Sequence, residues 1–121
     1  MTQKKLLIPQ ELEIPPTGDI TVLQDHMKRL CTHFGWETEA EKKFILLVEE
    51  VGEVAKAIRK YERITVDVTQ KTDNRQALHQ NLAEELADVF SYLLDIANQY
   101  DVDLGKAYTD KMSANFSRTW E

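Results

Sequence analysis

The sequence predicts an all-α protein, a four-helix bundle whose two central helices run antiparallel. Apolar residues recur at helical spacing in four segments, and acidic residues lie beside the apolar positions of the two central ones. All three prolines fall within residues 1–18, so the residue that most strongly interrupts helices is missing from the rest of the chain. The chain is therefore expected to consist of an extended N-terminal arm, residues 1–18, and a helical domain, residues 19–121.

Capping residues bound the first two predicted helices. Asp19 offers an N-cap and Gly35 a C-terminal stop for a helix with one apolar face: Ile20, Leu23, Met27 and Leu30. Thr38, with Glu41 three residues later, matches a capping box. A long second helix is expected from there to about Tyr61.

Two further helices follow a polar connection. Residues 62–74 are polar with a β-branched patch and are expected to form a loop. The third helix is expected from about residue 75 to residue 100. Asp103 is a suitable N-cap for a fourth helix over residues 104–118.

The composition excludes several function classes. The chain has 21 acidic and 15 basic residues and a net charge of −6, which argues against a protein that binds a nucleic-acid polymer. No apolar run approaches the ~20 residues of a membrane span, so no membrane partner is expected. The single cysteine, Cys31, cannot form an internal disulfide, and the start of the chain is too polar for a signal peptide. The expected location is the cytoplasm.

The second predicted helix carries more apolar surface than one amphipathic face requires. These residues surround more than half of its circumference: Phe44, Ile45, Leu47, Val48 and Val51. Three short partner helices would not cover all of them. We therefore expect self-association, as a homodimer or a dimer of dimers.

The same helix and the third one carry acids directly beside their apolar stripes. Glu49, Glu50 and Glu53 fall within one third of the circumference of the second helix. One edge of the third helix is polar: Asn81, Glu85, Asp88, Tyr92 and Asp95. Two such helices can direct four carboxylates into one space, where like charges repel unless a cation lies between them. The competing interpretation is ordinary surface charge, since most acidic residues are exposed.

Oxygen-only donors favour Mg²⁺, with Mn²⁺ as the alternative. A di-iron bundle would instead carry Glu-x-x-His on two helices. His26, His33 and His79 do not stand in that register, so iron and zinc are not expected.

Two segments contain these acids, Leu47-Val-Glu-Glu-Val-Gly-Glu-Val-Ala-Lys-Ala-Ile and Glu84-Glu-Leu-Ala-Asp-Val-Phe-Ser-Tyr-Leu-Leu. Together they resemble the signature of the MazG-like all-α nucleoside triphosphate pyrophosphohydrolases, and the resemblance extends over residues 23–118, through Val102-Asp-Leu-Gly-Lys-Ala and Lys111-Met-Ser-Ala-Asn-Phe-Ser-Arg. It implies a four-helix MazG-like bundle. It also implies four Mg²⁺ ligands: Glu50, Glu53, Glu85 and Asp88. Glu49 would be a further ligand or would orient the attacking water.

The chain departs from the family pattern in two places. The connection between the two acidic segments is longer than is common in the family. The tail ends in Arg118-Thr-Trp where relatives often have Arg-x-Tyr or Arg-Tyr-Pro.

Lys111, Asn115 and Arg118 share one face of the fourth predicted helix. Three donors in a row suit phosphate oxygens, and arginine can make a bidentate contact. The spacing alone favours an exposed solubilising stripe, whereas the family resemblance favours phosphate binding.

Three aromatic residues are candidates for binding the base: Trp36, His33 and Tyr92. Trp36 could equally act as a hydrophobic staple beside the Thr38 cap, and Tyr92 could simply close the core. Gly52 interrupts a helix at a cost of ~1 kcal/mol relative to alanine, which suggests that another backbone or the substrate approaches closely there.

These observations predict a Mg²⁺-dependent nucleotide pyrophosphohydrolase. Water, activated by a carboxylate and the metal, would attack a phosphorus of a nucleoside triphosphate, and the monophosphate and pyrophosphate would leave. The expected role is the clearance of non-standard or surplus nucleotides. Two alternatives remain: a narrower relative, such as a dUTP or dCTP hydrolase or a phosphoribosyl-ATP pyrophosphohydrolase, and a non-catalytic helical dimerisation module.

Overall fold

The computed structural model describes residues 10–14, 19–36, 39–63 and 74–117. In these residues the regular structure is entirely helical, which confirms the predicted all-α class. A short 3₁₀ helix comes first, and four α-helices follow: η1 (Gln10–Leu12), α1 (Ile20–Phe34), α2 (Ala40–Tyr61), α3 (Arg75–Gln99) and α4 (Leu104–Phe116).

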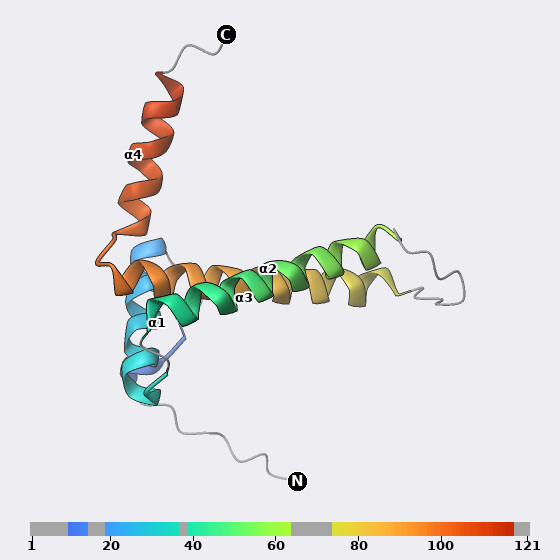
Figure 1. Cartoon of the computed structure of the whole chain (residues 1–121), viewed down its shortest axis with the longest axis horizontal. Helices are drawn as coiled ribbons and strands as arrows, with labels where there is room; N and C mark the ends of the chain where they lie inside the picture. Colours follow the sequence, from blue (N-terminus) through green and yellow to red (C-terminus); the bar gives the residue numbers. More distant parts are fainter. Residues whose placement is uncertain (1–9, 15–18, 37–38, 64–73, 118–121) are drawn as a thin grey trace.

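The two long helices α2 and α3 form an antiparallel pair, as predicted (Figure 1). Helix α1 packs across one end of this pair, mainly against α3. At the opposite end, Arg75 lies over the ring of Tyr61, 4.2 Å from its centroid, and donates a hydrogen bond of 3.1 Å to the Tyr61 carbonyl. This contact joins the end of α2 to the start of α3. No described helix is long and apolar enough to cross a bilayer.

Local capping residues set the predicted ends of α1 and α4. The Asp19 carboxylate accepts a hydrogen bond of 2.9 Å from the backbone N–H of Val22. Asp103 accepts one of 3.0 Å from the N–H of Lys106. Gly35 ends α1 with φ at 63°, a left-handed conformation that costs glycine little. The structure confirms these three caps.

Helix α2 begins at Ala40, and its N-cap is Glu39, whose side chain makes no capping hydrogen bond. Thr38, the cap expected from the sequence, lies outside the described residues, as does Arg118 beyond the end of α4. Of the predicted loop over residues 62–74, the structure describes Glu62, Arg63 and Asn74. The Asn74 side chain caps α3 through a 3.0 Å hydrogen bond from the N–H of Ala77.

Part of the N-terminal arm packs on α1. Leu12, in η1, is only 3% exposed. Its carbonyl oxygen lies 3.1 Å from Nε2 of the buried His26, which must carry the proton because a carbonyl can only accept. The segment predicted to be extended therefore contains one helical turn that covers the side of α1.

Helix α4 is attached to the rest of the molecule at its N-terminal end. The Gln24 side chain donates to the Val102 carbonyl at 2.6 Å and accepts from the Leu104 N–H at 3.1 Å. In the described part of the chain α4 packs mainly on α1, and Figure 1 shows it leading away from the α2–α3 pair. Its outer residues Tyr108 and Phe116 are 62% and 89% exposed.

Along α2 and α3, the described residues leave an apolar stripe uncovered. Of the five α2 residues expected to carry excess apolar surface, Phe44, Ile45, Val48 and Val51 are exposed, and Leu47 is half-buried. Four α2 residues share one face at helical spacing, two further residues come from α3, and each of the six is at least 42% exposed: Phe44, Val48, Val51, Ile58, Leu86 and Leu93. We call these six residues the α2–α3 stripe.

The expected close approach at Gly52 is not present among the described residues, because a Cβ added there would meet no atom within 4 Å. Gly52→Ala should therefore raise the free energy of unfolding by about 0.5–1 kcal/mol through better helix propensity. Urea unfolding monitored by circular dichroism would measure this change. Gly35→Ala is the matched control and should destabilise, since its φ is positive. A loss of stability in Gly52→Ala would contradict the open surroundings seen here.

Candidate active site

Three acidic side chains from α2 and α3 meet between the helices. Glu50, Glu85 and Asp88 each place one carboxylate oxygen within 4.8 Å of the other two. Glu50 and Glu85 are half-buried and Asp88 is exposed. We call these residues the carboxylate trio. The antiparallel pairing produces it, because it sets the middle of α2 beside the middle of α3.

Like charges dominate the electrostatics of the trio. Burial, followed by the negative charges of Asp88 and Glu85, raises the pKa of Glu50 above its ordinary value. Positive charge in the space between the three groups would relieve this repulsion.

The donor set of the trio fits a hard cation. All its donors are carboxylate oxygens, the ligands that Mg²⁺ and Mn²⁺ prefer. Among the described residues no histidine or cysteine joins the group. The trio is therefore suited to hold a cation that also contacts phosphate oxygens.

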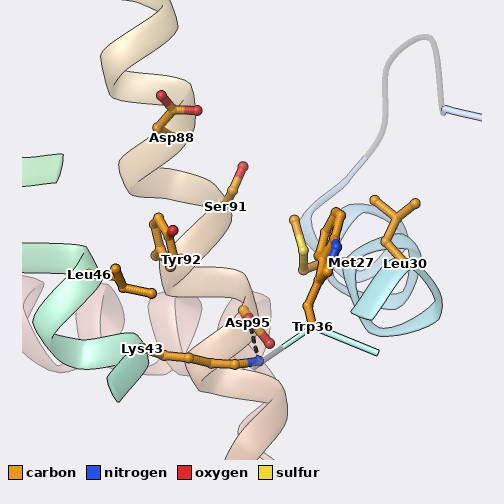
Figure 2. A pocket seen from close by; sticks show the side chains of 9 residues that line it. All are labelled: Met27, Leu30, Trp36, Lys43, Leu46, Asp88, Ser91, Tyr92 and Asp95. Carbon is orange, nitrogen blue, oxygen red and sulfur yellow. Dashed lines mark ion pairs between the residues drawn. The ribbon is translucent and has the colours of Figure 1, made fainter. Parts of the chain in front are cut away.

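A cavity of about 410 Å³ adjoins the trio and shares Asp88 with it. Its volume lies within the range of small-molecule sites. Its walls are side chains of α1, α2 and α3 together with Trp36, two residues beyond the end of α1 (Figure 2): Met27, Leu30, Trp36, Lys43, Leu46, Asp88, Ser91, Tyr92 and Asp95.

The family comparison covers both the trio and most of the cavity wall. Residues 39–116 match the model of the MazG nucleotide pyrophosphohydrolase domain. The chain belongs to the MazG family. It is also 36% identical over 73 residues to the uncharacterized protein YvdC of Bacillus subtilis (strain 168), a match that spans 58% of this chain and 69% of that protein.

The other two predicted acids of this MazG domain stand at the margin of the trio. Glu53, expected as a fourth ligand, is exposed and contributes no oxygen to the trio, although its charge adds to the rise in the Glu50 pKa. It lies one turn further along α2, nearer the solvent. Glu49 is also exposed, and its charge helps to raise the pKa of Tyr92.

The three aromatic candidates differ in position. Trp36 and Tyr92 line the cavity, whereas His33 is absent from its wall. Trp36 stacks on Phe34 with the ring centroids 5.3 Å apart. His33 packs edge-on against the same Phe34 ring, with the centroids 4.8 Å apart. Burial and the charges of Glu50 and Asp88 raise the pKa of Tyr92, so its hydroxyl stays protonated and can donate a hydrogen bond.

The two described members of the predicted phosphate-binding set, Lys111 and Asn115, stand on a helix that leads away from the trio of their own chain. Lys111 is exposed and Asn115 half-buried on α4, which leads away from α2 and α3 (Figure 1). Arg118 lies outside the described residues.

Sequence reasoning missed one buried lysine of the MazG domain. Lys43 is 2% exposed and lies 2.5 Å, Nζ to Oδ2, from Asp95 of α3. The sequence pattern places Asp95 on the polar edge of the third helix but assigns it no role. Nothing in the sequence separates Lys43 from its exposed neighbour Lys42, because both occupy the first turn of a helix whose packing partners are distant in sequence.

Proposed function

We propose that the protein is a Mg²⁺-dependent nucleotide pyrophosphohydrolase that converts a nucleoside triphosphate, ribo or deoxy, and water to the monophosphate and pyrophosphate. Its proposed role is to clear non-standard or surplus nucleotides. The observation that carries the proposal is the meeting of Glu50, Glu85 and Asp88 beside a cavity large enough for a nucleoside. Membership of the MazG family supports the same reaction class.

In this proposal the trio holds the cation at the mouth of the cavity, with Mn²⁺ as a substitute for Mg²⁺. When bound, the cation would neutralise phosphate charge and lower the pKa of a bound water molecule. The trio positions the phosphates relative to the nucleoside cavity. Glu53 is proposed to complete the ligand set when the phosphates arrive, and Glu49 to orient the attacking water as a hydrogen-bond acceptor.

We further propose that a second copy of the chain covers the α2–α3 stripe, which gives a homodimer or a dimer of dimers. Six large apolar side chains that are 42–59% exposed on adjoining helices are a surface that monomers rarely leave open. A second copy could also bring Lys111, Asn115 and Arg118 to the phosphates, since α4 leads away from the trio of its own chain.

The assembly is expected to sediment at micromolar concentration with at least twice the 14.0 kDa mass of one chain. Val51→Glu places a charge in the α2–α3 stripe and should shift the distribution toward monomer, because a buried charge without a partner is costly. Lys56→Glu, on an exposed site away from the stripe, is the control and should leave the mass unchanged. A wild-type protein that sediments only at 14.0 kDa would exclude the oligomer.

A screen of pyrophosphate release across nucleotides with Mg²⁺ tests the proposed function. Turnover of several triphosphates supports the house-cleaning role. If only one nucleotide is turned over, such as dUTP, dCTP or phosphoribosyl-ATP, the protein is a hydrolase of narrow specificity and not a house-cleaning enzyme. No turnover of any nucleotide would contradict the enzymatic proposal and leave a helical binding module.

A further inference from the structure

A buried ion pair closes the cavity at the end opposite the trio. Lys43 extends from α2 toward Asp95 of α3, and their side chains are only 2% and 10% exposed (Figure 2). Both residues also line a second, smaller cavity of about 170 Å³. The pair therefore contributes to the walls of both cavities.

The ammonium of Lys43 has more donors than the fold uses. It carries three N–H groups, and no described atom accepts from it in good hydrogen-bond geometry, although the Asp95 carboxylate lies beside it. Buried charges are costly unless they are paired and hydrogen-bonded. A ligand with an acceptor at this end of the cavity would satisfy the remaining donors.

The cavity has the length and the walls of a nucleoside site. Asp88 of the trio and Asp95 of the pair are seven residues apart on α3, which is roughly 10 Å at 1.5 Å per residue. That length is comparable to the distance from the 5′ oxygen of a nucleoside to the far edge of its base. Between the two ends, Trp36, Tyr92 and Met27 offer flat or pliable apolar surface for a base.

We propose that this cavity binds the nucleoside and that Lys43 and Asp95 select bases with a lactam edge, a carbonyl beside an N–H, as in uracil, thymine, guanine and hypoxanthine. This inference rests on the proposed function and names the substrate class of the same site. Lys43 donates to the carbonyl, and Asp95 accepts from the N–H.

Cytosine and adenine present an amino group beside a basic ring nitrogen instead. In the pose of a lactam base, the amino group would face the Lys43 ammonium and the lone pair of the ring nitrogen would face the Asp95 carboxylate, so neither hydrogen bond would form. A carbonyl oxygen carries two lone pairs and can satisfy more than one donor of Lys43. The pair therefore matches the lactam edge better.

Calorimetric binding of nucleoside monophosphates tests this selectivity without depending on turnover. With Mg²⁺ present, the wild-type protein should bind UMP and GMP roughly tenfold to a hundredfold more tightly than CMP, AMP and N3-methyl-UMP, the difference that one or two charge-assisted hydrogen bonds make. CMP keeps the shape of UMP but reverses the donor and the acceptor, whereas N3-methyl-UMP carries a methyl group in place of the N–H. The same order is expected in kcat/KM for the triphosphates.

The double variant Lys43→Met, Asp95→Leu removes both charges together, so neither is left unpaired in the interior. Its binding ratios should fall to near unity. Lys42→Met, the exposed neighbour, is the matched control and should keep the wild-type ratios. Circular dichroism checks that the variants are folded, and the wild-type comparison of UMP with the nearly isosteric CMP decides even if the double variant is not folded.

Binding of CMP or AMP by the wild-type protein as tight as that of UMP, or equal binding of UMP and N3-methyl-UMP, would overturn the inference. A folded double variant that retains the lactam preference would also overturn it. Selective binding of UMP without turnover of any triphosphate would instead contradict the proposed function and leave the nucleoside site standing.

Discussion

Glu50→Gln is expected to abolish pyrophosphate release while the protein stays folded. Glu50 lies at the centre of the carboxylate repulsion and supplies one of the three clustered oxygens. The loss should exceed the roughly 10–100-fold cost of removing a residue that only supports a metal ligand. Asp88→Asn should have the same effect, because it removes a second member of the trio.

The same substitution should stabilise the protein in metal-free buffer at neutral pH. The pKa of Glu50 is raised in the folded state, so the folded protein holds this proton more tightly than the unfolded chain does. Stability from this group is therefore present at low pH and is lost as the pH rises from the unfolded pKa through the folded one. Glutamine has no proton to lose, so the variant should not show this decline.

Thermal unfolding with and without Mg²⁺, together with an activity assay, measures both effects. The wild-type Tm should rise with Mg²⁺ by mass action, and that of Glu50→Gln should respond far less. Glu84→Gln is the matched control, since Glu84 lies next to Glu85 on α3 but outside the trio. If Glu50→Gln keeps full activity and Mg²⁺ does not change the Tm of the wild-type protein, the trio is not the metal site.

The second large effect is expected on α4. Lys111→Ala, Asn115→Ala and Arg118→Ala should each weaken phosphate binding, and Arg118→Ala the most, because it loses a charge-assisted hydrogen bond worth ~1.5–3 kcal/mol. That corresponds to a drop of about tenfold to a hundredfold in kcat/KM. The stabilisation by Mg²⁺ without nucleotide should not change, since the trio stands on other helices.

Mixed oligomers show whether these residues act on the site of a partner chain. Glu50→Gln and Lys111→Ala are each impaired alone, but a mixed dimer would contain one site with intact acids and an intact phosphate-binding face. Random pairing in a two-fold dimer should then restore roughly a quarter of the wild-type sites. If mixing the two variants restores no activity, these residues do not act on the site of a partner chain. If the activation free energy calculated from kcat/KM changes by less than about 0.5 kcal/mol in all three single variants, the three residues form an exposed stripe without function.

The features that local sequence determines were predictable. Asp19 and Asp103 cap their helices through hydrogen bonds that span three residues, so sequence spacing alone predicts them. Glu50, Glu85 and Asp88 converge because two periodic helices pair antiparallel, which a long amphipathic pattern and a connecting loop imply.

The features that depend on distant packing were not predictable. Lys43 is buried because α3 places Asp95 beside it, and its sequence neighbourhood is that of an ordinary exposed lysine. The direction of α4 depends on how Gln24 of α1 holds the turn before Leu104, a contact across most of the chain. Glu53 lies one turn beyond Glu50 and is exposed, and how closely it approaches α3 depends on the packing of the two helices, which its spacing in the sequence does not give.

Product analysis during turnover of a nucleoside triphosphate tests whether the protein is a Mg²⁺-dependent pyrophosphohydrolase. With Mg²⁺, we expect equimolar nucleoside monophosphate and pyrophosphate without orthophosphate. We also expect a chelator to stop the formation of both products and added Mg²⁺ to restore it. Release of a nucleoside diphosphate and orthophosphate, or equal turnover in the presence of the chelator, would contradict the proposed reaction.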